Sequence, residues 1–214
     1  HGPRHELRLL ILRGPRGEGK TLAVFWACAA LAERVAQETG ALPLEIAIVR
    51  DTYTNLERTV LKTFEEIDRD WAVPIRWQNA RHEAIVGDPP TMHFSFFGLD
   101  RPEDADKLQG FVCGVLVLEE VAPAAGIASG IPASVLGIGA TSVRQAGVPP
   151  RILVPMNPPD KNHWILRVEE HLAEAGLRGV TVQHFVIPQG EKAIHFRALA
   201  AMGYGEEWLE AATA

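Results

Sequence analysis

Apolar residues follow two different spacings along this chain. In four short runs they are nearly continuous, which is typical of strands buried on both faces of a parallel sheet. These runs are residues 7–12, 45–49, 113–118 and 151–154. Elsewhere they recur at helical spacing, as in residues 55–70, where Leu56, Val60, Phe64 and Ile67 would share one face. The pattern therefore predicts buried strands separated by amphipathic helices.

Further segments continue this alternation. Residues 20–37 are mostly good helix formers, and Gly40 supplies a stop signal. Shorter strands are expected at residues 75–78, 83–86, 91–97 and 180–186, and further helices at 162–175 and 194–212. The Gly-, Ala-, Ser- and Pro-rich region 122–146 predicts no single structure. Alternating strands and helices indicate an α/β fold with a mostly parallel central sheet flanked by helices.

Length and composition are those of a globular domain. The chain has 214 residues, of which 47% are hydrophobic and 22% charged. This length fits one large domain, or one domain with a small appended lobe. No apolar run reaches the roughly 18 residues needed to span a bilayer, so no membrane partner is expected. The first residue is His1 rather than Met, as expected of a fragment or a processed chain.

Charge and cysteine usage narrow the function classes. The net charge of −6 argues against a stand-alone DNA-binding domain, which usually carries a basic face. It does not exclude a motor that holds DNA through a local patch or another domain. Cys28 and Cys113 both stand among apolar residues, which predicts two buried free thiols. None of the eight histidines stands at metal-ligand spacing from cysteines or acids.

A phosphate-binding loop is the strongest chemical signal. The pattern G-x-x-x-x-G-K-[ST] is matched by Gly14, Pro15, Arg16, Gly17, Glu18, Gly19, Lys20 and Thr21. An expected strand precedes the loop and an expected helix follows it. Glycines let backbone N–H groups wrap around phosphate oxygens, and the helix N-terminus attracts the anion. Lys20 would reach the β- and γ-phosphates of ATP, and the Thr21 hydroxyl would bind Mg²⁺.

Two acids end the apolar run at residues 113–118. Glu119 would support the Mg²⁺ ion, and Glu120 would orient and deprotonate the water that attacks the γ-phosphate. An Asp is more usual in the first position, so the longer arm of Glu119 would reach the metal through a bridging water. A solvated acidic strand end is the alternative interpretation when these residues are taken alone.

Asn157 follows another expected strand and stands between Met156 and two prolines. A polar side chain there can hydrogen-bond the attacking water or the γ-phosphate and report its presence to the rest of the domain. Taken alone, the segment is more typical of an Asn-Pro turn.

In this order, the motifs resemble the ATPase domain of phage large terminase subunits. The resemblance covers about residues 7–170 and is most specific in the order of its parts. The matching segments are residues 14–21, 48–52, 97–99, 107–110, 118–122 and 156–159, with His163 and Trp164 after the last. In that family the phosphate loop often carries an Arg at the place of Arg16, whose charge would lie close to the triphosphate.

The resemblance implies a P-loop NTPase fold of the RecA-like (ASCE) type and ATP-driven translocation of double-stranded DNA into a procapsid. It also implies a homo-oligomeric ring, a capsid portal protein and a small terminase subunit as partners, and the cytoplasm of an infected host cell as the location. Residues 1–178 would be the ATPase domain and residues 179–214 a lid or linker lobe. The family's metal-dependent nuclease domain would lie outside this chain.

One position departs from the family. Many terminases carry an Arg before the Gly that corresponds to Gly110, where it can serve as an arginine finger, but this chain has Gln109. Arg16, Arg101 and Arg144 are the remaining candidates. Two other classes of function stay open: a helicase- or recombinase-like ATPase, and a nucleotide-dependent switch with little turnover. No Asn-Lys-x-Asp motif for reading guanine is present.

Several other residues are better explained by packing or solvation than by function. Phe25, Trp26, His163, Trp164 and His184 are expected to be packing residues, partly buried in the case of the histidines. Lys161, Arg167 and Arg178 could contact DNA phosphates, but a solvated surface explains them equally well.

Overall fold

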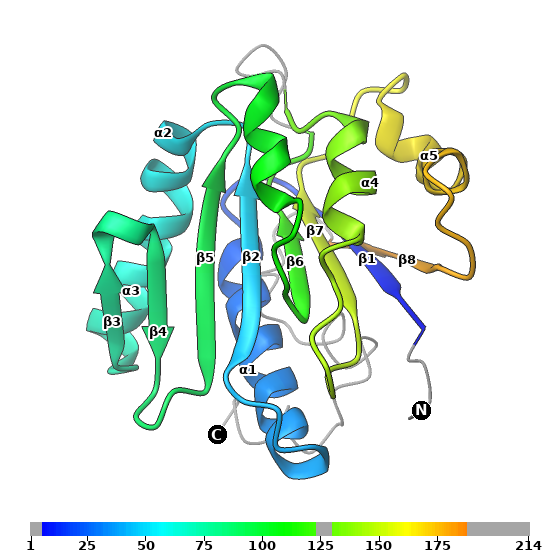
Figure 1. Cartoon of the computed structure of the whole chain (residues 1–214). Coiled ribbons are helices and arrows are strands. Elements are labelled where there is room, and N and C mark those ends of the chain that lie inside the picture. Colours follow the sequence, from blue (N-terminus) through cyan, green and yellow to red (C-terminus); the bar gives the residue numbers. More distant parts are fainter. Residues whose placement is uncertain (1–5, 123–129, 188–214) are drawn as a thin grey trace.

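A single mixed sheet runs through the protein in the computed structural model, which describes residues 6–122 and 130–187. Its strands are β1 (Arg8–Arg13), β2 (Leu44–Arg50), β3 (Ile75–Gln78), β4 (Glu83–Val86), β5 (Met92–Gly98), β6 (Val115–Leu118), β7 (Arg151–Met156) and β8 (Thr181–Val186). The strand order is β3-β4-β5-β2-β6-β7-β1-β8 (Figure 1). The part from β5 to β8 is parallel, whereas β3 and β4 form an antiparallel extension.

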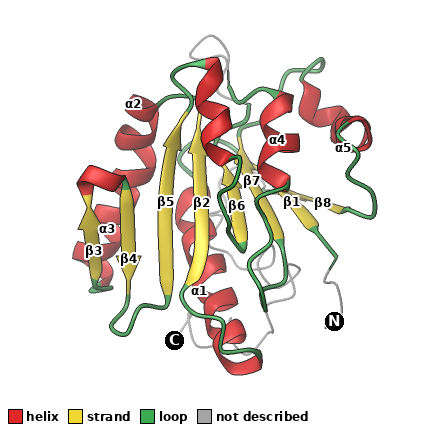
Figure 2. Ribbon diagram, viewed as in Figure 1, coloured by secondary structure: helices red, strands yellow, loops and turns green. Residues whose placement is uncertain are grey.

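Helices cover both faces of this sheet (Figure 2). The α-helices are α1 (Lys20–Glu38), α2 (Tyr53–Leu56), α3 (Lys62–Trp71), α4 (Ala133–Ala140) and α5 (Val168–Glu174). A π-helical turn, η1 (Glu57–Leu61), joins α2 to α3, and the 3₁₀ turns are η2 (Asn79–Arg81), η3 (Pro102–Leu108) and η4 (Trp164–Arg167). None of the described helices is long and apolar enough to cross a membrane.

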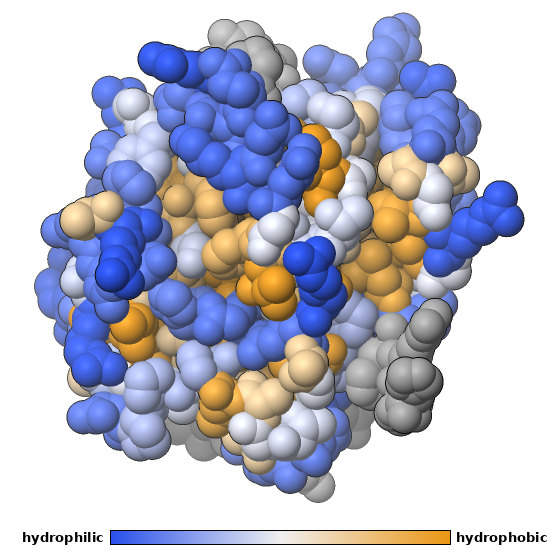
Figure 3. Space-filling view, in the orientation of Figure 1, coloured by the Kyte–Doolittle hydropathy of each residue, from blue (hydrophilic) through white to orange (hydrophobic). Residues whose placement is uncertain are grey.

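Side chains point alternately to the two faces of each strand, so the sheet has one hydrophobic core on each face. In β2, Ile46 and Ile48 pack with α1, α2 and α3 on one face. Ala47 and Val49 pack on the other face with the side chains of η3, α4 and α5. On this second face, apolar surface gathers beside the helices η3 and α4 rather than over them (Figure 3). Because the strands from β5 to β8 are parallel, their carboxyl ends lie at one edge of the sheet, which is where ligands bind in open α/β sheets.

The expected strands are confirmed, and the main helical difference lies between residues 122 and 146. There the chain forms α4, which the sequence did not predict because Gly137 and Gly139 are poor helix formers. Gly139 is needed for packing, since a Cβ at this position would lie 2.6 Å from Leu116 Cδ2 of β6. The predicted helix at residues 55–70 is present but contains the π-helical turn.

β8 corrects the expected division of the chain. It was predicted as a strand at the start of a separate lobe, but it pairs in parallel with β1 along the main sheet. The boundary expected after residue 178 therefore does not separate this strand from the ATPase domain. The rest of the expected lobe, including the helices at residues 194–212, lies outside the described residues.

Most of the predicted packing residues have that role. Phe25 is buried, and the Trp164 indole donates a hydrogen bond to the Ile131 carbonyl over 2.9 Å. Cys28 and Cys113 are buried free thiols, and burial raises the pKa of each to about 12. The prediction for His184 is wrong: this side chain is exposed, because β8 is an edge strand.

A histidine of β5 lies between two carboxylates of the neighbouring strands β2 and β4. His93 Nδ1 of β5 lies 2.9 Å from Glu45 Oε2 of β2, and His93 Nε2 lies 3.4 Å from Glu83 Oε2 of β4. The hydrogen bond with Glu45 raises the pKa of His93, burial opposes this, and the charges of Glu45 and Glu83 add to the rise. Protonated His93 therefore links three neighbouring strands.

This arrangement predicts a pH-dependent stability. Because the folded-state pKa lies above the unfolded value of roughly 6.5, the stabilisation is complete below that pH and is lost as the pH rises through the folded-state pKa. Half-exposed ion pairs contribute about 0.2–1 kcal/mol each. Urea unfolding of the wild type and His93→Gln should give free energies whose difference shrinks as the pH rises above roughly 6.5. A constant difference would contradict the ion-pair assignment.

Candidate active site

The phosphate loop connects the end of β1 to the start of α1. Gly17 and Gly19 have φ values of +84° and +72°, in the left-handed region that other residues rarely adopt. No heavy atom lies within 4 Å of a Cβ built on either residue, so the backbone conformation rather than space requires glycine. The loop delivers the chain to the N-terminus of a 19-residue helix, whose free N–H groups attract anions.

Lys20, the first residue of α1, folds back over this loop. Its ammonium donates hydrogen bonds to the carbonyl oxygens of Gly14 (3.0 Å) and Pro15 (2.6 Å), and to Asn157 Oδ1 (3.4 Å). The side chain is only 8% exposed, and burial lowers its pKa, against the opposing charges of Glu119 and Glu120. A cation is thus held where phosphate oxygens would lie, and β7 supplies Asn157 beside it.

Thr21 and Glu119 form the second part of the site. The Thr21 hydroxyl donates a hydrogen bond to Glu119 Oε1 over 2.7 Å. Glu119 is 3% exposed, and burial raises its pKa to about 7. Its other oxygen, Oε2, is buried without a hydrogen-bond partner among the described residues. A hydroxyl, a carboxylate and an unsatisfied buried oxygen fit a hard divalent cation such as Mg²⁺, which prefers oxygen ligands.

Glu120 turns away from the strand that Glu119 continues. Its φ of 52° is unusual for a residue other than glycine, and such strained backbone is often found at functional sites. Its N–H donates to the Pro155 carbonyl over 2.9 Å, which fixes the turn against β7. Its side chain accepts a hydrogen bond from Arg50 Nη2 at Oε2, while Oε1 has no hydrogen bond to another described residue. Arg50 therefore holds Oε2, whereas Oε1 can accept a hydrogen bond from a ligand or a water.

Arg50 also belongs to this site, although its role was not predicted from the sequence. It ends β2, is 6% exposed, and contacts three groups besides its own backbone. Nη2 reaches Glu120 Oε2 over 2.5 Å, Nε reaches Asp51 Oδ1 over 3.4 Å, and Nη1 donates to Thr59 Oγ1 over 3.2 Å. A signal was available, since a charged residue at the end of a buried strand next to β6 must find a partner at that edge.

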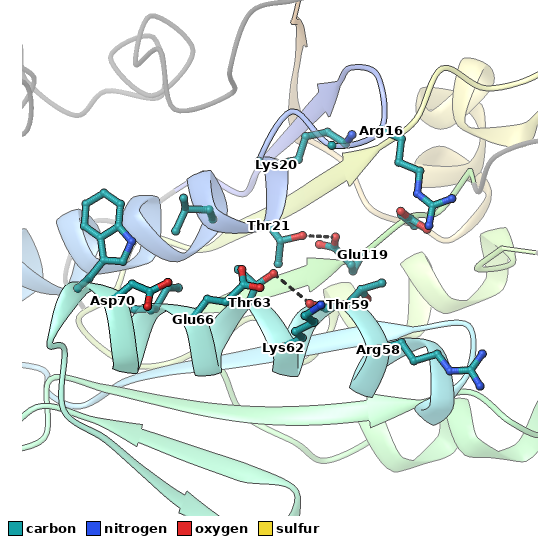
Figure 4. A pocket seen from close by; sticks show the side chains of 16 residues that line it. Arg16, Lys20, Thr21, Arg58, Thr59, Lys62, Thr63, Glu66, Asp70 and Glu119 are labelled. Atoms are coloured by element: carbon teal, nitrogen blue, oxygen red, sulfur yellow. Dashed lines mark hydrogen bonds between the residues drawn. The ribbon is translucent and has the colours of Figure 1, made fainter.

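These groups open into a groove of about 460 Å³ between the phosphate loop and the α2–α3 segment. Its lining includes Arg16, Gly17, Gly19, Lys20, Thr21, Glu119 and Glu120 from the loop side. From η1 and α3 it includes Arg58, Thr59, Lys62, Thr63, Glu66, Asp70 and Trp71 (Figure 4). The groove has the volume of a small-molecule site.

The three candidate arginine fingers lie in three different places. Arg16 lines it, but Arg101 lines a separate cavity of about 270 Å³ with Asp51 and Asp100. Arg144 lies at the opposite edge of the sheet, where its N–H bonds to the Cys113 carbonyl before β6 begins. Gln109 is exposed and donates to Asp106. Of the three candidates, only Arg16 faces the phosphate loop within this chain.

No protein-family model matches the sequence, and no curated protein matches it. Among solved structures, the chain is similar to the large terminase of the thermophilic bacteriophage D6E in complex with ADP, with a TM-score of 0.57, 18% identity, and coverage of 82% of this chain and 39% of that one. It is also similar to that terminase in another crystal form (TM-score 0.56, 18% identity, coverage 82% and 40%) and in complex with ATP-γ-S (0.55, 17%, 82% and 38%).

This likeness confirms the expected fold. The chain has the P-loop NTPase architecture of large terminases, with a mostly parallel sheet flanked by helices. It spans about two fifths of the length of the terminases that it matches.

Proposed function

We propose that this chain is the ATP-hydrolysing domain of a DNA-packaging motor of the large terminase type. The observation that carries the proposal is the hydrogen bond of 2.7 Å between Thr21 and the buried Glu119, formed directly beside the Lys20 ammonium. It links the phosphate loop to the acidic end of β6, as a site for a nucleotide with a divalent cation requires. The likeness to terminases solved with ADP and ATP-γ-S supports the same function.

Binding of ATP would exchange the partners of Lys20. Its ammonium now satisfies two loop carbonyls, those of Gly14 and Pro15. The β- and γ-phosphate oxygens would replace them, since an ammonium attracts an anionic phosphate oxygen more strongly than a neutral carbonyl oxygen. The loop N–H groups and the N-terminus of α1 would hold the remaining phosphate oxygens, and Arg16 would add positive charge from the loop's outer side.

Thr21 and Glu119 would hold Mg²⁺, and Glu119 could do so directly or through a water. When bound, the ion neutralises charge on the β- and γ-phosphates. Glu119 must be ionised for this role, although burial raises its pKa to about 7. Its buried and unsatisfied Oε2 is the atom that would gain most from a nearby cation.

Glu120 would activate the attacking water. Arg50 holds Oε2 and thereby orients the carboxylate, so Oε1 can accept a proton from a water aimed at the γ-phosphate. Asn157, which already contacts Lys20, would hydrogen-bond the γ-phosphate or the attacking water and report its presence to β7.

The wider activity belongs to the whole protein, of which this chain would be one part. We propose translocation of double-stranded DNA into a procapsid by a homo-oligomeric ring, with a capsid portal protein and a small terminase subunit as partners. The setting would be the cytoplasm of an infected host cell. A nuclease domain and the lid or linker lobe, of which residues 188–214 would form part, would complete the motor.

The proposal is tested by phosphate release from radiolabelled ATP in single turnover, with protein in excess over nucleotide, so that slow product release does not mask the chemistry. We expect hydrolysis that requires Mg²⁺ and stops when the metal is chelated. Tight Mg·ATP binding without hydrolysis would favour the nucleotide-dependent switch instead. Absence of nucleotide binding would refute both.

A further inference from the structure

Two cationic side chains lie on the wall of the groove opposite the phosphate loop. Arg58 lies in η1 and Lys62 begins α3, about one turn later, and both side chains are exposed. Both line the groove together with Lys20 and Thr21. In Figure 4, Lys62 extends from α3 toward the Thr21–Glu119 pair, across the groove from the phosphate loop that carries Arg16 and Lys20. Neither Arg58 nor Lys62 forms an ion pair with another described residue.

The unpaired charges of the groove are mostly positive. Its lining holds four cations, Arg16, Lys20, Arg58 and Lys62, and four carboxylates, Glu66, Asp70, Glu119 and Glu120. Two of these carboxylates are already paired, Glu120 with Arg50 and Asp70 with Arg69. The excess of positive charge in a partly enclosed groove suits a ligand that carries several negative charges.

The π-helical turn gives this wall a direct connection to the acidic site. Isolated π-helical turns are frequent at functional sites. Thr59, next to Arg58, donates from its hydroxyl to the Asn55 carbonyl over 2.7 Å and accepts from Arg50 Nη1 over 3.2 Å. Arg50 in turn holds Glu120. A ligand bound by Arg58 would therefore act on a turn that is hydrogen-bonded to the partner of Glu120.

We propose that Arg58 and Lys62 form a second cationic wall of the triphosphate site and contact the terminal phosphate from the side opposite Lys20. The chain then binds a nucleoside triphosphate in preference to the diphosphate, because only the triphosphate reaches across the groove. This inference rests on the proposed function and adds two specificity-determining residues to it. The sequence offered no sign of them, since exposed cations on a helix usually face only solvent.

A nucleotide fits this wall better than duplex DNA does. The two residues line the same groove of about 460 Å³ as Lys20, a volume suited to a small molecule. A DNA duplex is gripped along its backbone by exposed basic surfaces rather than inside such a groove. If the two residues served DNA instead, their loss would weaken DNA binding and leave nucleotide affinity unchanged.

The test measures binding of ATP-γ-S and of ADP, each with Mg²⁺, to the full chain and to an Arg58→Gln/Lys62→Gln variant by calorimetry. Two lost charge-assisted contacts should weaken ATP-γ-S binding by about 10–100-fold, and ADP binding by no more than about 3-fold. Arg76→Gln/Arg81→Gln also removes two positive charges, from exposed positions outside the groove, and should change neither affinity. Lys62→Arg, which keeps the charge, should stay close to the wild type.

Other results would overturn the proposal. They are equal losses for both nucleotides, no loss for either, or weakened DNA binding with unchanged nucleotide affinity. Because both side chains are exposed, the variant should unfold at the wild-type temperature, which separates lost contacts from lost folding. Failure of the proposed function itself would look different, since the wild type would then bind neither nucleotide.

Discussion

Replacing Glu120 with glutamine is expected to leave Mg·ATP bound and to slow its hydrolysis by roughly 10²–10⁴-fold, the contribution of a positioned general base. Glutamine preserves the shape of the side chain and a hydrogen bond to Arg50, so the turn at φ 52° should persist. It cannot accept the proton of the attacking water. Single-turnover phosphate release and equilibrium ATP binding, measured on the same samples, separate the two effects.

Two further variants make this test specific. Glu66→Gln removes an exposed carboxylate from the wall of the same groove and should hydrolyse ATP at nearly the wild-type rate. Glu119→Gln should instead raise the Mg²⁺ concentration needed for half-maximal hydrolysis, because Glu119 is the proposed metal ligand and bonds to Thr21 rather than to Arg50. If Glu119→Gln were inactive and Glu120→Gln fully active, the two carboxylates would have the opposite roles.

Replacing Lys20 with alanine is expected to lower ATP affinity by at least about 100-fold, since a charge-assisted contact with the phosphates is lost in a partly buried site. The fold should survive, because Lys20 lines the open groove and water can enter the space that its side chain leaves beside its partners, two loop carbonyls and Asn157. Calorimetric titration with Mg·ATP-γ-S measures the change. Lys161→Ala, at an exposed position, is the matched control. Unchanged affinity in Lys20→Ala would end the phosphate-loop assignment.

The central sheet was predictable because its strands carry nearly continuous apolar runs, which few other structures accommodate. The site was predictable where chemistry is tied to a strand end. Thr21 follows a glycine-rich turn after β1, and Glu119 follows β6, so parallel strands bring them to one edge. The helix α4 was not predictable, because glycines disfavour helices. Only the tertiary structure shows that Gly139 is required there by its close approach to Leu116.

Groups whose role depends on tertiary neighbours were missed or left open. Arg50 is a single charged residue at a strand end, and only the adjacency of β2 and β6 gives it Glu120 as a partner. Arg16 stands in the phosphate loop, but the positions of Arg101 and Arg144 stayed open because nothing local says which edge of the sheet each one faces. The π-helical turn that carries Arg58 is hydrogen-bonded to Arg50 through Thr59, which is likewise a tertiary contact.

A crystal structure of the chain grown with saturating Mg·ATP-γ-S examines the nucleotide site most directly. The terminal phosphates should replace the Gly14 and Pro15 carbonyls as partners of the Lys20 ammonium, with the metal ion beside Thr21 and Glu119. A groove left empty at saturation, or a nucleotide bound elsewhere on the molecule, would contradict the account and would leave the neighbouring carboxylates without their assigned roles.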